Sequence, residues 1–152
     1  MQPYNHNNLL LAIGNSSRGD DGLGWAFLER IAEQIGEDWT AEQRYQLQVE
    51  DAEMLTHFQR ILFVDATLET LPDGFALAPC IPNADAGPYS HQQTPGAVLF
   101  LCQTLYGHAP EAFVLKITGY QWDLGAGMSP SAVKNLDKAL KYFATRFLKH
   151  IG

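Results

Sequence analysis

The chain has 152 residues, 46% of them hydrophobic, and a formal net charge of −7 at pH 7. A chain of this length buries about two-thirds of the surface that its unfolded form exposes, so we expect one domain spanning residues 1–152. The negative charge argues against nucleic acid or an anionic membrane as a partner. No segment approaches the roughly 20 apolar residues of a membrane span.

The opening MQPYNHNN lacks the basic stretch of a signal peptide, which favours a cytoplasmic protein. Cys80 and Cys102 are too far apart for a C-x-x-C pair. We expect both to be buried thiols in a reducing compartment.

The stretch from Leu9 to Gly24, LLLAIGNSSRGDDGLG, joins a short apolar run to a polar, glycine-rich turn. Residues 9–13 have the continuous apolar character of a buried parallel strand, and a helical pattern begins after the turn. Ligands of open α/β sheets bind at the carboxyl ends of such strands, so Asp20 and Asp21 mark a candidate functional site. A phosphate-binding loop is disfavoured because G-x-G-x-x-G and a P-loop lysine are absent and two carboxylates repel phosphate.

Apolar periodicities along the chain predict alternating strands and helices. In chain order they are a strand at 9–13, a helix at about 23–36, a more exposed strand at 45–49, a short helical segment within 50–58, a buried strand at 61–65, a strand at 75–80, a helix from Pro95, a strand at 112–118 and a helix at about 130–149. Thr94 and Ser129, each followed by proline, are predicted N-caps. The pattern favours an α/β fold, a three-layer α/β/α sandwich around a mostly parallel, twisted sheet of about five strands.

One strand is expected to run against the others. Residues 66–74, ATLETLPDG, are too short to hold a crossover helix and end in a Pro-Asp-Gly turn signal. The strand at 75–80 is therefore predicted to be antiparallel to the strand at 61–65.

Asp65 is the last residue of the buried apolar run ILFVD. If the first three strands lie in the order 2-1-3, the first and third are neighbours that diverge at the switch point of the sheet. Asp65 then faces the turn that holds Asp20 and Asp21. The competing interpretation is that Asp65 only caps the turn after its strand.

His91 lies in the irregular loop 81–93, IPNADAGPYSHQQ, shortly before the helix that begins at Pro95. In that place its side chain is free to face a cleft, whereas the other four histidines lie in the leader, in polar turns or at the terminus. The competing interpretation is a solvated surface histidine.

Three motifs occur in a familiar order: GNSSRGDDGLG after the first strand, FVDAT at the end of the third, and SHQQTPG before a helix. Together they resemble the nickel-iron hydrogenase maturation endopeptidases, which have a GN(x)₄DEG or DDG turn, a strand-end Asp-Ala and a loop containing His-Gln. The block ITGYQWDLGAGMSPSAV is similar to the family's last-strand segment, where a glycine-rich stretch leads to a Ser/Thr-Pro helix start. The resemblance covers nearly the whole chain.

The resemblance implies an endopeptidase that removes a C-terminal extension from a hydrogenase large-subunit precursor once nickel is installed. In the family, one acidic turn residue, the strand-end Asp and the loop His contact the metal, and the matching positions here are Asp21, Asp65 and His91. Asp20 matches an acidic residue that is not the usual ligand. The nickel is expected to arrive with the substrate, and no organic cofactor is implied.

Two departures from the family pattern are visible. The turn ligand is often Glu, so the shorter Asp21 requires the metal or the backbone to lie closer. The segment 50–58, EDAEMLTHF, lacks the glycine- and threonine-rich opening of the family, which leaves the identity of the recognised large subunit open.

Two carboxylates and an imidazole are sound ligands for a divalent metal such as nickel, and three protein ligands leave positions for water or substrate. Serine, cysteine and zinc-peptidase chemistries are disfavoured because G-x-S-x-G and H-E-x-x-H are absent and neither cysteine is expected in the cleft. Two mechanisms stay open. The metal activates water and polarises the carbonyl, or it only marks the substrate while Asp21 or Asp65 acts as general base.

Two alternatives belong to other functional classes. A non-catalytic nickel-checkpoint or chaperone module of hydrogenase assembly would need the same ligands, and a flavodoxin-like nucleotide binder would use the same sheet edge.

Two further expectations concern single residues. Asp20 is expected to cap the helix that follows it, and His91 alone is expected to titrate between about pH 5.5 and 8, because aspartate pKa values lie near 4.

Overall fold

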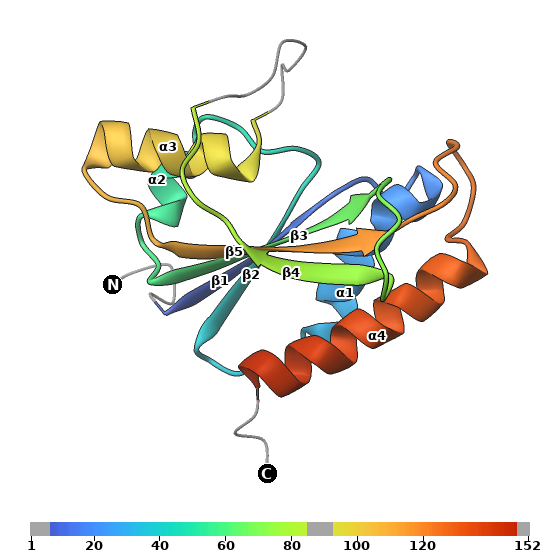
Figure 1. Ribbon diagram of the computed structural model, residues 1–152. Helices are drawn as coiled ribbons and strands as arrows, with labels where there is room; N and C mark the ends of the chain where they lie inside the picture. The colour runs from blue at the N-terminus through green and yellow to red at the C-terminus, as the bar shows by residue number, and fades with distance from the viewer. Residues whose placement is uncertain (1–6, 85–92, 149–152) are drawn as a thin grey trace.

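The computed structural model describes residues 7–84 and 93–148, and within them five strands form one sheet in the order β2-β1-β3-β5-β4 (Figure 1). The elements are β1 Asn8–Ile13, the 3-10 helix η1 Gly19–Gly22, α1 Leu23–Ile31, β2 Trp39–Arg44, α2 Asp51–Leu55, β3 Arg60–Thr67, β4 Phe75–Pro79, α3 Pro95–Tyr106, β5 Glu111–Thr118 and α4 Pro130–Phe147. None of these helices has the length and apolar character that crossing a bilayer requires.

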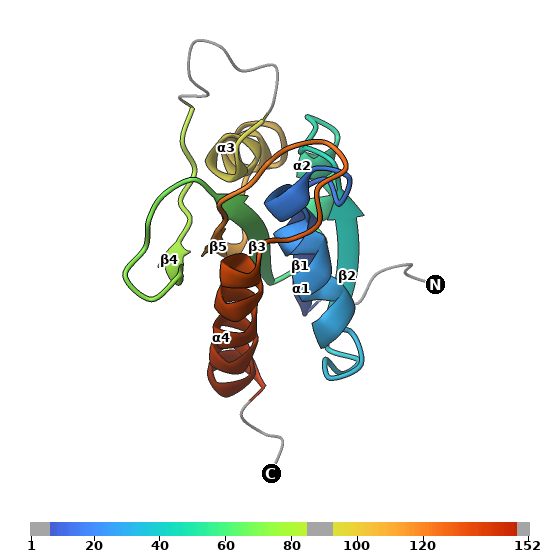
Figure 2. The ribbon, with the colours of Figure 1, turned by 90° about the vertical axis from the view of Figure 1, so that its right-hand side faces the viewer.

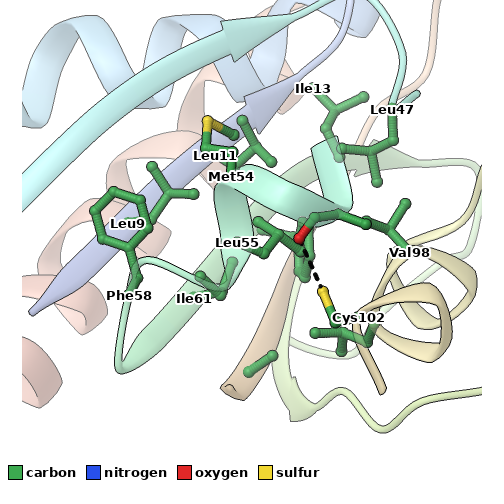
Figure 3. Close-up of a cluster of buried hydrophobic side chains, with 14 residues drawn as sticks. Leu9, Leu11, Ile13, Leu47, Met54, Leu55, Phe58, Ile61, Val98 and Cys102 are labelled. Carbon is green, nitrogen blue, oxygen red and sulfur yellow. Dashed lines mark hydrogen bonds between the residues drawn. The ribbon is translucent and has the colours of Figure 1, made fainter. Parts of the chain in front are cut away.

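Helices cover both faces of the sheet, with α1 and α4 on one face and α2 and α3 on the other (Figures 1 and 2). Strand side chains alternate between the faces. In β1, Leu9 and Leu11 join the core under α2 and α3, whereas Leu10 and Ala12 join the core against α1 and α4. Figure 3 shows the first of these cores, in which the Cys102 thiol donates a hydrogen bond to the carbonyl of Ala52 at 3.2 Å. The predicted three-layer sandwich is confirmed.

The strand order places β1 and β3 side by side, as the 2-1-3 arrangement requires. Both pairs, β1 with β2 and β1 with β3, are parallel. Strand β4 runs antiparallel, as predicted, but its hydrogen-bonded partner is β5, which lies between β3 and β4. The antiparallel direction of β4 was therefore predictable from the short connection between β3 and β4. The pairing of β4 with β5 was not predictable from that connection.

The prediction of a second strand at 45–49 is wrong, because β2 is Trp39–Arg44. Tyr45 and Val49 alternate in sequence with Leu47, but both are exposed, and only Leu47 is buried. The strand forms one segment earlier because Trp39 packs edge-on against Phe143 of α4, which anchors the start of β2 beside β1.

Helix boundaries differ from the sequence pattern in one place. α1 ends at Ile31, and a series of turns follows it where the periodicity predicted helix to about residue 36. Ile35 still packs against the core, so the apolar stripe continues although the helix does not. The predicted N-caps are confirmed, since Thr94 accepts from the N–H of Ala97 at 3.1 Å and Ser129 accepts from the N–H of Ala132 at 3.3 Å.

Candidate active site

The turn between β1 and α1 folds back so that Asp21 lies beside the end of β1. The N–H of Asn15 donates to the carbonyl of Asp21, and the N–H of Asp21 donates to the carbonyl of Arg18, both at 3.1 Å. Gly14 has φ +153°, and a Cβ at this position would lie 2.1 Å from the Asp21 carbonyl oxygen. The turn thus requires glycine at position 14, which explains the abrupt end of the apolar run.

Asp65 reaches the α3 side of the sheet because of strand alternation. Ile61 and Phe63 face the core under α2 and α3, and Asp65 follows them on the same side. β3 extends two residues beyond Asp65 to Thr67, so Asp65 does not end the strand as predicted. Its Oδ1 accepts from the N–H of Ala66 at 2.8 Å, inside the strand, which does not support the interpretation of Asp65 as the cap of a following turn.

A hollow of about 320 Å³ opens above Asp65. Its lining residues come from β3, β5, the end of β4 and the start of α3, and they are Asp65, Ala66, Thr67, Cys80, Pro95, Gly96, Val114 and Lys116. The Lys116 ammonium group also pairs with Glu69 at 3.1 Å. In β5, Lys116 stands between the buried residues Leu115 and Ile117, so a charged residue inside an apolar strand was the sequence signal for this opening.

The pKa values of both site aspartates are raised, and the charge of Asp21 contributes to the rise at Asp65. Burial raises the pKa of Asp65 to about 7; the Ala66 N–H opposes this rise, the negative charge of Asp21 adds to it, and the Lys116 charge lowers it. Burial also raises the pKa of Asp21, against the Arg18 charge and a backbone hydrogen bond from Asn15. The expectation that only a histidine titrates between about pH 5.5 and 8 is therefore wrong, because Asp65 titrates in that range.

Cys80 lines the hollow, so the expectation that neither cysteine lies in the cleft is wrong for this residue. Burial raises the pKa of its thiol. A nucleophilic cysteine requires the opposite shift, because the thiolate is the reactive form. Cys80 thus contributes a small apolar wall to the hollow.

His91 lies outside the described residues. Within residues 7–84 and 93–148, no group of three or more His, Cys, Asp or Glu side chains is arranged to hold a metal ion. The described part of the chain therefore supplies Asp21 and Asp65 to the candidate site, and the predicted third ligand stays a prediction.

Asp20 does not cap the helix that follows it, contrary to the sequence-based expectation, since neither η1 nor α1 has a side-chain cap. Its fully buried carboxylate instead accepts four hydrogen bonds from the loop before α4. The donors are the N–H of Tyr120 at 2.7 Å, the N–H of Gln121 at 3.0 Å, and both the N–H and the hydroxyl of Ser129 at 2.7 Å. Because these donors are 100 to 109 residues away, no local pattern could reveal them.

Comparisons with known proteins agree on the fold. No protein-family model and no curated protein sequence matches the chain. Among solved structures, the chain is similar to the hydrogenase maturating endopeptidase HybD from E. coli, with TM-score 0.76 and 13% identity over 95% of this chain and 94% of that one.

Two proteins from Thermococcus kodakarensis are also similar. The [NiFe] hydrogenase maturation protease HybD has TM-score 0.68 and 21% identity over 91% of this chain and 97% of its own. The maturation protease HycI has TM-score 0.68 and 17% identity over 95% and 93%. The chain has the fold of the nickel-iron hydrogenase maturation proteases, which confirms the resemblance at the level of structure.

Proposed function

We propose that the protein is a cytoplasmic endopeptidase that removes the C-terminal extension of a nickel-loaded hydrogenase large-subunit precursor. The observation that carries the proposal is the effect of the Asp21 charge, in the turn after β1, on the pKa of Asp65, which lies near the end of β3 and lines a hollow, in the fold of known maturation proteases. The nickel is part of the substrate in this proposal, and Asp21, Asp65 and His91 are its contacts.

The connection to α3 supports a place for His91 at this site. Pro95 lines the hollow together with Asp65. Three residues separate His91 from Pro95, and a fully extended chain spans at most about 3.5 Å per residue. This short connection is the reason that the proposal keeps His91 as the third nickel contact.

The raised pKa of Asp65 supports the mechanism in which the nickel marks the substrate and a carboxylate acts as general base. A base works best when its pKa lies near the working pH, and the pKa of Asp65 is about 7. In this mechanism the Asp65 carboxylate takes a proton from water, and the hydroxide adds to the scissile carbonyl carbon. The protonated Asp65 then gives the proton to the leaving amine as the peptide bond breaks.

Incubation of the protein with purified large-subunit precursor, followed by intact-mass measurement, tests this function. We expect the nickel-loaded precursor to lose the mass of its C-terminal extension and the nickel-free precursor to keep its mass. A precursor that binds the protein but is never shortened would instead identify a non-catalytic checkpoint or chaperone. Saturable binding of a flavin or nucleotide, with no effect on the precursor, would identify a nucleotide binder.

A further inference from the structure

The turn that holds Asp21 is joined to a loop from the other end of the chain. The turn 14–22 and the loop 119–129 lie side by side in both ribbon views, where the last loop arches over η1 (Figures 1 and 2). Three backbone hydrogen bonds connect them: Gly19 N–H to Ala126 at 3.1 Å, Asp20 N–H to Gln121 at 2.8 Å, and Gly125 N–H to Ser17 at 2.7 Å.

The carboxylate of Asp20 is the centre of this junction. Oδ1 accepts one hydrogen bond, from the N–H of Ser129, and Oδ2 accepts three, from Tyr120, Gln121 and the Ser129 hydroxyl. Hydrogen bonds to an ionised carboxylate are stronger than those between neutral groups, and both oxygens of Asp20 take part in them. The side chain of Asp20 is completely buried, so it is not exposed to a metal or a substrate.

The turn 14–22 and the loop 119–129 also approach each other closely around Asp20. A Cβ at Gly119 would lie 2.7 Å from the Cβ of Asp20, and a Cβ at Gly19 would lie 2.5 Å from the carbonyl oxygen of Gln121. The two segments thus pack closely, Gly119 against the Asp20 side chain and Gly19 against the Gln121 backbone. Such packing transmits a displacement of one segment directly to the other.

Ser129 extends the junction to α4. Its hydroxyl donates to Asp20 and its oxygen accepts from the N–H of Ala132, so it also caps the helix. α4 packs along the sheet beside α1 and β5. The Asp20 carboxylate is in this way attached to a long, rigid element rather than to a free loop, and a negative charge at a helix N-terminus is favourable.

We propose that Asp20 is a positioning residue of the active site, which uses its four hydrogen bonds from Tyr120, Gln121 and Ser129 to hold the adjacent Asp21 beside Asp65. This role rests on the proposed peptidase function for its catalytic consequence. Asp20 contacts neither substrate nor metal. It positions Asp21 through its hydrogen bonds to the loop 119–129 and through the peptide bond that joins it to Asp21.

Two substitutions remove hydrogen bonds between Asp20 and the loop 119–129, one on each side of this junction. A third, conservative substitution keeps these hydrogen bonds. Asp20→Asn replaces two of the acceptor sites with an N–H₂ group, and Ser129→Ala removes one donor from a residue that does not line the hollow. Ser129→Thr keeps the hydroxyl and its capping function. Phe147→Leu, at the opposite end of α4, serves as a control for a general loss of stability.

The test measures kcat and KM for the nickel-loaded precursor and, separately, amide hydrogen exchange of the free protein. We expect Asp20→Asn and Ser129→Ala to lower kcat by about 100-fold with KM changed less than about threefold, because misplacement of a reacting group by about 1 Å has this effect. Ser129→Thr and Phe147→Leu keep a kcat within about threefold of the wild type. Both junction variants accelerate exchange at Asn15 and Asp21, whose amides are hydrogen-bonded within the turn.

Two results would overturn the positioning role. One is a wild-type kcat in both junction variants. The other is faster exchange in the loop 119–129 with Asn15 and Asp21 as protected as in the wild type. If the wild-type protein itself shortens no precursor, the proposed function fails, and the exchange measurement still decides whether Asp20 holds the turn.

Discussion

The negative charge of Asp21, after β1, adds to the effect of burial in raising the pKa of Asp65 in β3 to about 7. The two residues are 44 positions apart in sequence, and the parallel pairing of β1 with β3 brings them to one edge of the sheet. Lys116 acts in the opposite sense on the same carboxyl group. The pKa of Asp65 therefore depends on the positions of the Asp21 and Lys116 charges around it.

Two substitutions should move the pKa of Asp65 in opposite directions. Asp21→Asn removes a negative charge and should lower this pKa, whereas Lys116→Met removes a positive charge and should raise it. Carboxyl-carbon NMR titration of the labelled protein measures both. Arg30→Gln, which breaks a surface ion pair with Asp137, is a control that should leave the pKa of Asp65 unchanged. A shift of the same sign in both site variants would contradict the assigned partners.

The raised pKa of Asp65 should make the protein less stable as pH rises from about 4 to 7. In this range the unfolded chain has lost the carboxyl proton that the folded protein keeps, so the free energy of unfolding falls with rising pH. A pKa difference of about three corresponds to at most about 4 kcal/mol. Asp65→Asn mimics the protonated form and should stabilise the protein at pH 8 but not at pH 4. Urea unfolding at both pH values measures the effect, and equal stabilisation at both would contradict it.

The rate of precursor processing should rise with pH, with a midpoint near 7. A general base must be ionised, and Asp65 becomes ionised in this range. A neutral His91 would contribute to the same rise, so His91→Gln should keep part of the pH dependence in any activity that it retains. Single-turnover rates between about pH 5.5 and 8 measure the profile. A flat profile with stable substrate would exclude Asp65 as the base.

The free protein should bind nickel weakly. Two carboxylates and one imidazole lack the thiolates of tight transition-metal sites, and the proposal assigns the nickel to the substrate. Isothermal titration with nickel should give an affinity far weaker than nanomolar, reduced further by His91→Ala. Nanomolar binding by the wild type would favour a resident catalytic metal.

Much of the fold was predictable because its signals are local. The continuous apolar runs in β1 and β3 indicated buried parallel strands, and the Thr-Pro and Ser-Pro pairs marked the starts of α3 and α4. β2 was misplaced because an edge strand lacks an apolar run, and its position depends on the contact of Trp39 with α4.

The candidate site was predictable where it depends on strand ends and unpredictable where it depends on distant partners. Asp21 and Asp65 follow from the order of the first three strands. The four hydrogen bonds of Asp20 depend on how the last loop folds over the turn, and no local pattern around Asp20 reveals these partners. The alternation in β5 around Lys116 was a usable signal for the hollow.

The most direct test of the proposed chemistry compares the wild-type protein with Asp65→Asn on the same nickel-loaded precursor, measured by intact-mass spectrometry over time. The asparagine amide keeps the shape of the protonated carboxyl group but accepts no proton from water. We predict complete loss of the C-terminal extension with the wild type and none with Asp65→Asn, while circular dichroism and the unfolding midpoint show a folded variant. Processing by Asp65→Asn at the wild-type rate would contradict the central claim that Asp65 is the general base of the cleavage.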